Sequence, residues 1–154
     1  MSRLVALPQA GFEALAALHA QAFERPWSAA EIETLAAAPG ALGLAAEDDG
    51  ALFGFVLIRA VAGEAEVLTL AVDPAQRRQG LGRALMQAAS SAAAGAGAEE
   101  IFLEVAEDNL AALALYTGAG FAPVGRRPAY YPRKTGAVDA ILLRARLNSG
   151  PPVG

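Results

Sequence analysis

The residues with the clearest chemical potential lie in one short segment near the middle of the chain. The segment reads Arg77-Arg78-Gln79-Gly80-Leu81-Gly82-Arg83. An apolar run ends just before it, and an apolar pattern with helical spacing begins at Leu81, which predicts a strand, a loop and a helix in succession. The first turn of a helix carries unpaired N–H groups and the positive end of the helix dipole. Glycines that admit a phosphate and arginines that supply donors therefore predict a pyrophosphate site here.

The spacing of the glycines argues against two common phosphate-binding loops. A nucleoside-triphosphate loop needs Gly-x-x-x-x-Gly-Lys-Ser/Thr, and no lysine follows these glycines. A dinucleotide-binding loop needs a third glycine, where this chain has Leu85. Taken alone, the segment also fits a glycine-containing helix start with a solvated basic turn.

The segment fits the pattern Arg/Gln-x-x-Gly-x-Gly/Ala, and in this it resembles the pyrophosphate loop of the Gcn5-related N-acetyltransferases. Further along the chain, the same family is matched by Leu103-Glu104-Val105, by Asn109 through Tyr116, and by Gly120-Phe121. The combined pattern Glu-Val, Asn-x-x-Ala-x-x-x-Tyr, Gly-Phe is more specific than the glycine loop alone. The resemblance implies an N-acetyltransferase that uses acetyl-CoA.

The resemblance assigns the two proton transfers of such a reaction to Glu104 and Tyr116. An amine arrives mostly as an ammonium, so a base must remove a proton before the nitrogen can attack the thioester carbonyl. Glu104, at the end of a predicted buried strand, is the candidate base, directly or through water. Tyr116 is the candidate acid that protonates the departing thiolate. The alternatives are a structural carboxylate at a strand edge and a half-buried packing tyrosine.

The resemblance also implies where acetyl-CoA, the co-substrate, is held. In the family, the strand before the glycine loop separates from its neighbour, which frees the backbone groups of Leu70, Ala71 and Val72 for the pantetheine arm and the thioester oxygen. Asn109 is placed to bond the cofactor from a helix start. The residues implied to contact the pyrophosphate are Arg78, Gln79, Gly80, Leu81, Gly82 and Arg83. No metal is expected.

Two further runs narrow the resemblance to the ribosomal-protein-alanine N-acetyltransferases, the RimI-like branch. They are Pro26-Trp27-Ser28 and Arg126-Arg127-x-x-Tyr130-Tyr131-Pro132, which continues to Asp139-Ala140. The branch implies that the partner is a protein N-terminus, the N-terminal alanine of a small-subunit ribosomal protein. Tyr130 and Tyr131 would then line the acceptor groove.

The chain departs from this branch after Val105. Ala106 stands where the branch commonly has arginine, and Glu107-Asp108 makes the following loop acidic. A different N-terminus, a lysine side chain or a small polyamine therefore stays open as the acceptor. A non-catalytic CoA-binding interaction module is the alternative from another functional class.

The elements that must position these residues follow from hydrophobic periodicity and turn signals. Strands are predicted at 3–7, 41–47, 51–60, 65–72, 101–105, 121–126 and 138–147. Helices are predicted at 11–23, 28–38, 80–94 and 109–117. With the resemblance, this order predicts an α+β fold of the GNAT type: a mixed, mostly antiparallel sheet of six to seven strands flanked by about four helices. Residues 1–147 are expected to form one domain and residues 148–154 a disordered tail.

Some local features of these elements are also predicted. Ser28 and Glu31 fit a capping box at the start of the second helix. Leu110, Leu113 and Ala114 are expected to face inward from the fourth helix, and Tyr130-Tyr131-Pro132 to lie in a loop between the last two strands. His19, the single histidine, falls on an apolar helix face, and a packed, hydrogen-bonded role is favoured over a catalytic one.

Composition limits the remaining possibilities. The 154 residues suffice for one domain, and the absence of cysteine excludes disulfides, thiolate metal sites and a cysteine nucleophile. A net charge of −4 argues against a direct nucleic-acid partner. No apolar stretch approaches the length of a membrane span, and the N-terminus lacks the features of a signal peptide. We expect a cytoplasmic protein without a membrane partner, monomeric or weakly dimeric.

Overall fold

The computed structural model describes residues 3–7, 11–23, 25–76 and 80–147, and within these ranges the backbone forms seven strands and four α-helices. The strands are β1 (Arg3–Ala6), β2 (Ala41–Asp48), β3 (Ala51–Val61), β4 (Glu64–Val72), β5 (Glu100–Ala106), β6 (Ala122–Tyr131) and β7 (Val138–Arg146). The helices are α1 (Phe12–Ala22), α2 (Ala29–Ala36), α3 (Leu81–Gly95) and α4 (Leu110–Gly118), with a short 3-10 helix at Pro74–Gln76. The tail 148–154 lies outside the described ranges.

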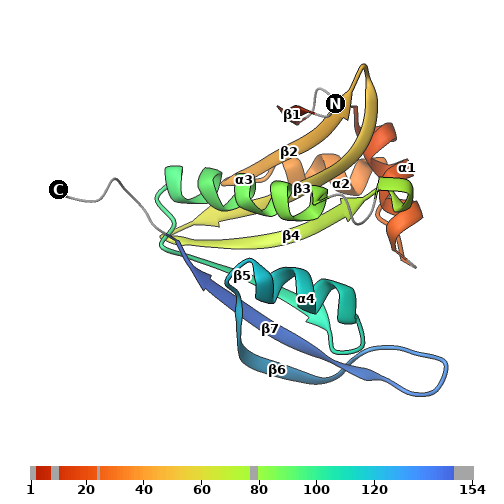
Figure 1. Cartoon of the computed structure of the whole chain (residues 1–154), viewed down its shortest axis with the longest axis vertical. Helices are drawn as coiled ribbons and strands as arrows, with labels where there is room; N and C mark the ends of the chain where they lie inside the picture. The colour runs from red at the N-terminus through yellow and green to blue at the C-terminus, as the bar shows by residue number, and fades with distance from the viewer. Residues whose placement is uncertain (1–2, 8–10, 24, 77–79, 148–154) are drawn as a thin grey trace.

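All seven described strands join one sheet, in the order β1-β2-β3-β4-β5-β7-β6. Every neighbouring pair is antiparallel except β4 and β5, which are parallel. This arrangement confirms the predicted α+β fold with a mixed, mostly antiparallel sheet. Figure 1 shows α3 lying across the half of the sheet that contains β2, β3 and β4, and α4 lying over β5 and β7.

The helices cover both faces of the sheet because side chains alternate along each strand. Ala46 and Val56 belong to a core cluster with residues of α3, whereas their neighbours Ala45 and Phe55 belong to a second cluster with residues of α1 and α2. The first cluster extends to β5, β7 and α4, and it therefore joins the two halves of the sheet. Among the described helices, none has the length and hydropathy that a membrane span needs.

Two tight turns set the register of β2, β3 and β4. Asp49 and Gly50 both have positive φ, and they connect the paired residues Asp48 and Ala51. A two-residue loop with two positive φ angles is the hairpin turn that fits the twist of antiparallel strands. The turn between β3 and β4 repeats this geometry at 62–63. The strands predicted at 41–47, 51–60 and 65–72 are thus joined as two hairpins, which carry the chain to the end of β4.

The predicted capping box starts α2. The Ser28 hydroxyl accepts a hydrogen bond from the Glu31 N–H at 3.1 Å, and the Glu31 carboxylate accepts one from the Ser28 N–H at 3.0 Å. These two bonds satisfy N–H groups that have no partner within the helix. Trp27 packs on the same core cluster as the fully buried Ile32, so the connection between α1 and α2 is fixed against the sheet.

Candidate active site

The glycine segment forms the start of α3. Gly80 is the N-terminal cap of the helix, with φ of 77°, and a Cβ atom there would meet nothing within 4 Å. Position 80 therefore requires glycine because of its left-handed backbone conformation, which residues with a Cβ rarely adopt. The helix that follows presents its free N–H groups at this end. Arg77, Arg78 and Gln79 lie outside the described residues, so their predicted pyrophosphate contacts stay predictions.

Gly82 and Arg83 connect this helix start to α4. A Cβ atom on Gly82 would lie 3.2 Å from Cδ2 of Leu115, so the small residue allows the two helices to approach. The Arg83 guanidinium donates a 2.7 Å hydrogen bond to the Gly118 carbonyl at the end of α4, where the helix dipole is negative. Arg83 thus has a structural partner that the sequence did not indicate, and its phosphate contact stays a prediction.

The parallel strands β4 and β5 separate soon after they begin. They pair only from Glu64 with Glu100 to Glu66 with Phe102. Beyond these three pairs the strands diverge, as Figure 1 shows, while β4 remains paired with β3 as far as Val72. The last part of β4 therefore has a neighbour on only one side.

This separation exposes particular backbone groups of β4. The Asp73 N–H donates to the Phe53 carbonyl of the preceding hairpin at 2.8 Å. Because backbone groups of alternate residues point to the same side of an antiparallel strand, those of Ala71 also point toward β3, and those of Leu70 and Val72 point away from it. Of the three residues predicted to offer backbone groups to a cofactor, Leu70 and Val72 have the suitable orientation.

Glu104 lies on β5 beyond the last pair with β4. Its neighbours Leu103 and Val105 are buried in the core beneath α3 and α4, so its side chain projects from the opposite face of the strand. Its Oε1 atom is 2.8 Å from the Nε atom of Arg127 on β6. This ion pair reaches diagonally across β7, where Glu104 faces Leu142 and Arg127 faces Ala140.

Tyr116 lies on the other side of β5. It is buried on α4 within the same core cluster as Leu103 and Val105, and its ring meets that of Phe121 edge to face at 5.8 Å. Burial raises the pKa of Tyr116 to about 12, so the phenol keeps its proton at neutral pH. The two candidate catalytic residues therefore occupy opposite faces of β5.

Asn109 is the N-cap of α4, and its side-chain oxygen accepts a 3.1 Å hydrogen bond from the Ala112 N–H. The prediction that Leu110 and Ala114 face inward is wrong, because both are exposed, Leu110 by 74%. The residues of α4 that pack on the core are Ala112, Leu113, Leu115 and Tyr116. The segment is apolar at nearly every position, so its pattern did not identify the buried face.

Tyr130 and Tyr131 lie at the end of β6, and the prediction that they belong to a loop is wrong. Their rings meet edge to face at 5.1 Å. The guanidinium of Arg127 lies 5.5 Å from the centre of the Tyr130 ring. Burial raises the pKa of Tyr131, and the charge of Glu104 raises it further. The two tyrosines, Arg127 and Glu104 therefore form one cluster, which we call the acceptor cluster.

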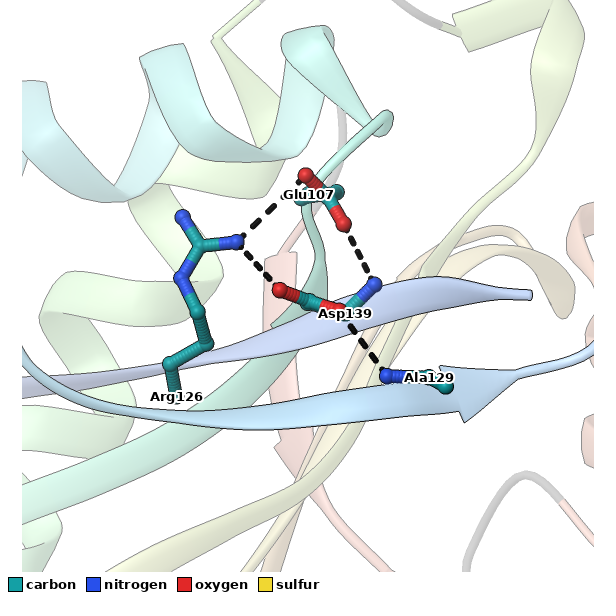
Figure 2. Close-up of polar contacts among 4 residues, drawn as sticks. All are labelled: Glu107, Arg126, Ala129 and Asp139. Carbon is teal, nitrogen blue, oxygen red and sulfur yellow. Dashed lines mark hydrogen bonds and ion pairs between the residues drawn. The ribbon is translucent and has the colours of Figure 1, made fainter.

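The acidic loop after β5 is neutralised by arginines. Asp108 accepts two hydrogen bonds of 2.9 Å from the guanidinium of Arg133, which lowers the pKa of this carboxyl. Glu107 pairs with Arg126 at 3.4 Å (Figure 2). The departure from the family pattern at these positions therefore does not create a patch of unpaired negative charge.

His19 is a core residue. It is 2% exposed, its Nδ1 atom accepts a 3.1 Å hydrogen bond from the Trp27 N–H, and its Nε2 atom lies 3.1 Å from the Thr69 hydroxyl. The ring stacks between Phe23 and Trp27. This environment agrees with the packed role favoured from the sequence. No group of three or more metal-ligating side chains occurs in the part of the chain that the structure describes.

Comparison with known proteins identifies the family of this chain and finds the same fold in a solved structure. The model of the acetyltransferase (GNAT) family matches residues 12–121. The chain belongs to this family. A crystal structure of the ribosomal-protein-S18-alanine N-acetyltransferase from Escherichia coli superimposes with a TM-score of 0.89 at 29% identity, over 100% of this chain and 99% of that one.

Two curated relatives of this GNAT chain agree with the structural match. The ribosomal protein bS18-alanine N-acetyltransferase of Escherichia coli K12 is 39% identical over 95 residues, which cover 62% of this chain and 64% of the relative. The chain thus matches just under two thirds of that relative's length. The N-alpha-acetyltransferase RimI of Mycobacterium tuberculosis is 39% identical over 153 residues, covering 96% of this chain and 92% of the relative.

Proposed function

We propose that the protein transfers the acetyl group of acetyl-CoA to the N-terminal amine of a protein, with the N-terminal alanine of a small-subunit ribosomal protein as the acceptor. The observation that carries this proposal is that Glu104 and Tyr116 flank β5 from opposite faces, beyond the point where β4 separates from it. A thioester lying between the strands would meet the amine on one face and release its sulfur on the other.

The residues at this separation suit acetyl-CoA. The free backbone groups of Leu70 and Val72 match the amides of a pantetheine arm, which can pair with β4 as a further strand would. A backbone N–H aimed at the thioester oxygen stabilises the negative charge that develops there. The start of α3 at Gly80, just beyond β4, then meets the pyrophosphate with its free N–H groups.

On the acceptor face, the amine nitrogen attacks the thioester carbon after the Glu104 carboxylate takes a proton from the ammonium, directly or through water. An α-ammonium has an ordinary pKa near 8 and a lysine ammonium one near 10.4, so deprotonation at neutral pH costs about 3 kcal/mol less for an N-terminus. A single carboxylate base suits this easier task. The relatives named for N-terminal acetylation support the same acceptor.

On the cofactor face, the carbon–sulfur bond breaks and the sulfur leaves as a thiolate, which finally takes, through water, the second proton that the nitrogen loses as it becomes an amide. Tyr116 holds its proton strongly, since its pKa is about 12, whereas an ordinary thiol has a pKa near 8.5. Full transfer of the phenol proton to the thiolate is therefore uphill by about 5 kcal/mol. The main role of Tyr116 is therefore to stabilise the developing thiolate by donating a hydrogen bond to it.

Purified protein tests the proposal with three matched acceptors: a peptide with a free N-terminal alanine, the same peptide with a blocked N-terminus and one lysine, and a polyamine. We expect CoA release and a mass increase of one acetyl group with the free N-terminus alone. Acetylation restricted to lysine or the polyamine would contradict the proposed acceptor. Acetyl-CoA binding without CoA release from any amine would favour the non-catalytic module.

The natural acceptor is tested by mass spectrometry of N-termini and lysines in cells with and without the protein. We expect the acetyl group to disappear from the N-terminal alanine of a small-subunit ribosomal protein. If only lysines or small amines lose acetyl groups, the N-terminal proposal fails.

A further inference from the structure

The pairing of β6 with β7 is interrupted next to the acceptor cluster. Arg127 pairs with Ala140 and Tyr131 pairs with Val138, so four steps along β6 correspond to two steps along β7. Two extra residues are therefore accommodated in β6. Because a strand advances about 3.3 Å per residue, this bulge draws Tyr131 roughly 7 Å closer to Arg127 than regular pairing would.

The bulge depends on an unusual backbone conformation. Ala129, inside it, has φ of 52°, in the left-handed region that residues with a Cβ rarely adopt. The carboxylate of Asp139, at the start of β7, accepts the Ala129 N–H at 2.8 Å (Figure 2). Pro128 has no N–H, so it leaves no unpaired donor in the bulge. Asp139 therefore supplies the side-chain bond that holds Ala129 in place.

The other oxygen of Asp139 connects the bulge to two further segments. Oδ2 lies 2.6 Å from Nη1 of Arg126, and the same Nη1 atom lies 3.4 Å from Oε1 of Glu107, in the loop after β5. The Asp139 N–H donates to the other oxygen of Glu107. Figure 2 shows the four residues as one connected group.

This group lies on the face of the sheet away from Glu104. Arg126 precedes Arg127 on β6 and pairs with Ile141, so its side chain projects from the face opposite to that of Arg127. The hydrogen bonds and ion pair of Asp139 described above therefore go to Ala129, Arg126 and Glu107. Asp139 acts through the backbone, because the bulge that it holds carries Tyr130 and Tyr131.

We propose that Asp139 is a positioning residue for the acceptor: by binding the Ala129 N–H and Arg126, it fixes the β6 bulge that sets Tyr130 and Tyr131 beside Glu104. This inference rests on the proposed function, which assigns the acceptor to that cluster. It predicts that loss of Asp139 weakens use of the acceptor and leaves use of acetyl-CoA unchanged, since the cofactor residues lie on β4, α3 and α4.

Steady-state kinetics of three variants test this role, with whichever amine the unmodified protein acetylates. Asp139→Ala removes both interactions and is expected to raise the KM for the acceptor about tenfold, as loss of a charge-assisted hydrogen bond would. Asp139→Asn keeps an oxygen for the Ala129 N–H and should have a smaller effect. Arg126→Gln keeps the Asp139 bond to Ala129 and removes the ion pairs of a half-exposed side chain with Asp139 and Glu107, so it remains informative if Asp139→Ala does not fold.

A rescue experiment separates positioning from general destabilisation. Glycine adopts positive φ without strain, so Ala129→Gly reduces the need for the Asp139 bond. The double variant Asp139→Ala with Ala129→Gly is expected to recover most of the acceptor KM. The control is Glu47→Gln, which removes the ion pair with the exposed Arg3 at the opposite edge of the sheet and should change neither KM.

Two results would overturn the inference. One is an acceptor KM that stays unchanged in Asp139→Ala and Arg126→Gln. The other is an equal rise in the KM values of both substrates without rescue by Ala129→Gly, which indicates a purely structural role. Because the test uses any amine that is acetylated, a lysine or polyamine acceptor would refute the proposed function and still leave the role of Asp139 decidable.

Discussion

The Nε atom of Arg127 lies 2.8 Å from Oε1 of Glu104, so the candidate base already has a cationic partner before an amine arrives. The arginine side chain is 61% exposed, whereas that of the glutamate is 25% exposed. Because the guanidinium lies largely in solvent, the pair contributes little net stability. An incoming ammonium therefore competes with Arg127 for the carboxylate at small energetic cost, and the ion pair keeps the carboxylate oriented until then.

Glu104→Gln tests the base. The amide retains the shape of the side chain and cannot accept the proton, so the single-turnover acetylation rate should fall about 10²–10⁴-fold while the Kd for acetyl-CoA stays the same. The matched control is Glu100→Gln, because Glu100 lies on the same face of β5, also pairs with an arginine, and sits where β4 is still paired. Full activity of Glu104→Gln in rapid-quench measurements would remove it from the mechanism.

Tyr116→Phe tests the group beside the sulfur. The variant keeps the packing against Phe121 and loses the hydroxyl, so folding should be unaffected and the single-turnover rate should fall by about 10²-fold, the lower end for general acid catalysis. Because the pKa of Tyr116 is about 12, the rate of the unmodified protein should show no decline from this group up to about pH 10. A descending limb near neutral pH that disappears in Tyr116→Phe would contradict this assignment.

Glycine substitutions test the cofactor site at the start of α3. A Cβ at Gly82 would lie 3.2 Å from Leu115, so Gly82→Ala should shift the first helical turn and weaken acetyl-CoA binding by about 3–10-fold in calorimetry, and Gly82→Val by more. Gly95→Ala makes the same change at the other end of α3, where the new atom meets nothing within 4 Å. Equal affinity of the Gly82 and Gly95 variants would refute this location.

Because His19 is buried, we expect the free energy of unfolding of the protein to decrease in mild acid. Burial lowers the pKa of His19 below 6.5, an effect that the charge of Glu31 partly offsets. The unfolded chain therefore binds the proton more readily, and stability that is present above pH 6.5 decreases as the pH falls below it. In urea unfolding between pH 7.5 and 5.5, we expect this decrease in the unmodified protein and a smaller one in His19→Gln. Identical pH dependence of the two would contradict it.

The sequence predicted most of the fold because its signals are local. The apolar patterns of the strands and helices and the Ser28 capping box each depend on residues a few positions apart. The bulge in β6 has no such signal, since it depends on contact between Ala129 and Asp139, ten residues apart across a long loop. For this reason the sequence predicts a loop for the tyrosines before Pro132, where the structure has the end of a strand.

The candidate site was predictable in its residues and not in its contacts. Family motifs identified Glu104, Tyr116 and Asn109, whereas the partners Arg127 of Glu104 and Gly118 of Arg83 come from distant parts of the chain. Such pairs depend on how β6 lies beside β7 and how α3 lies beside α4. The Arg126-Arg127 motif was recognised as a family feature, but nothing in it indicated that its two side chains would serve opposite faces of the sheet.

The short pairing of β4 with β5 divides the sheet into two halves joined by a seam. Side-chain packing under α3 holds this seam together, while the amides of Leu70 and Val72 lack strand partners on that side. These two amides should therefore exchange hydrogen for deuterium rapidly in the free protein and slowly once a ligand's amides lie alongside. A bound pantetheine arm would then fill the gap between β4 and β5. The two halves of the sheet would unfold together and not separately, so binding would raise the free energy needed to open either half.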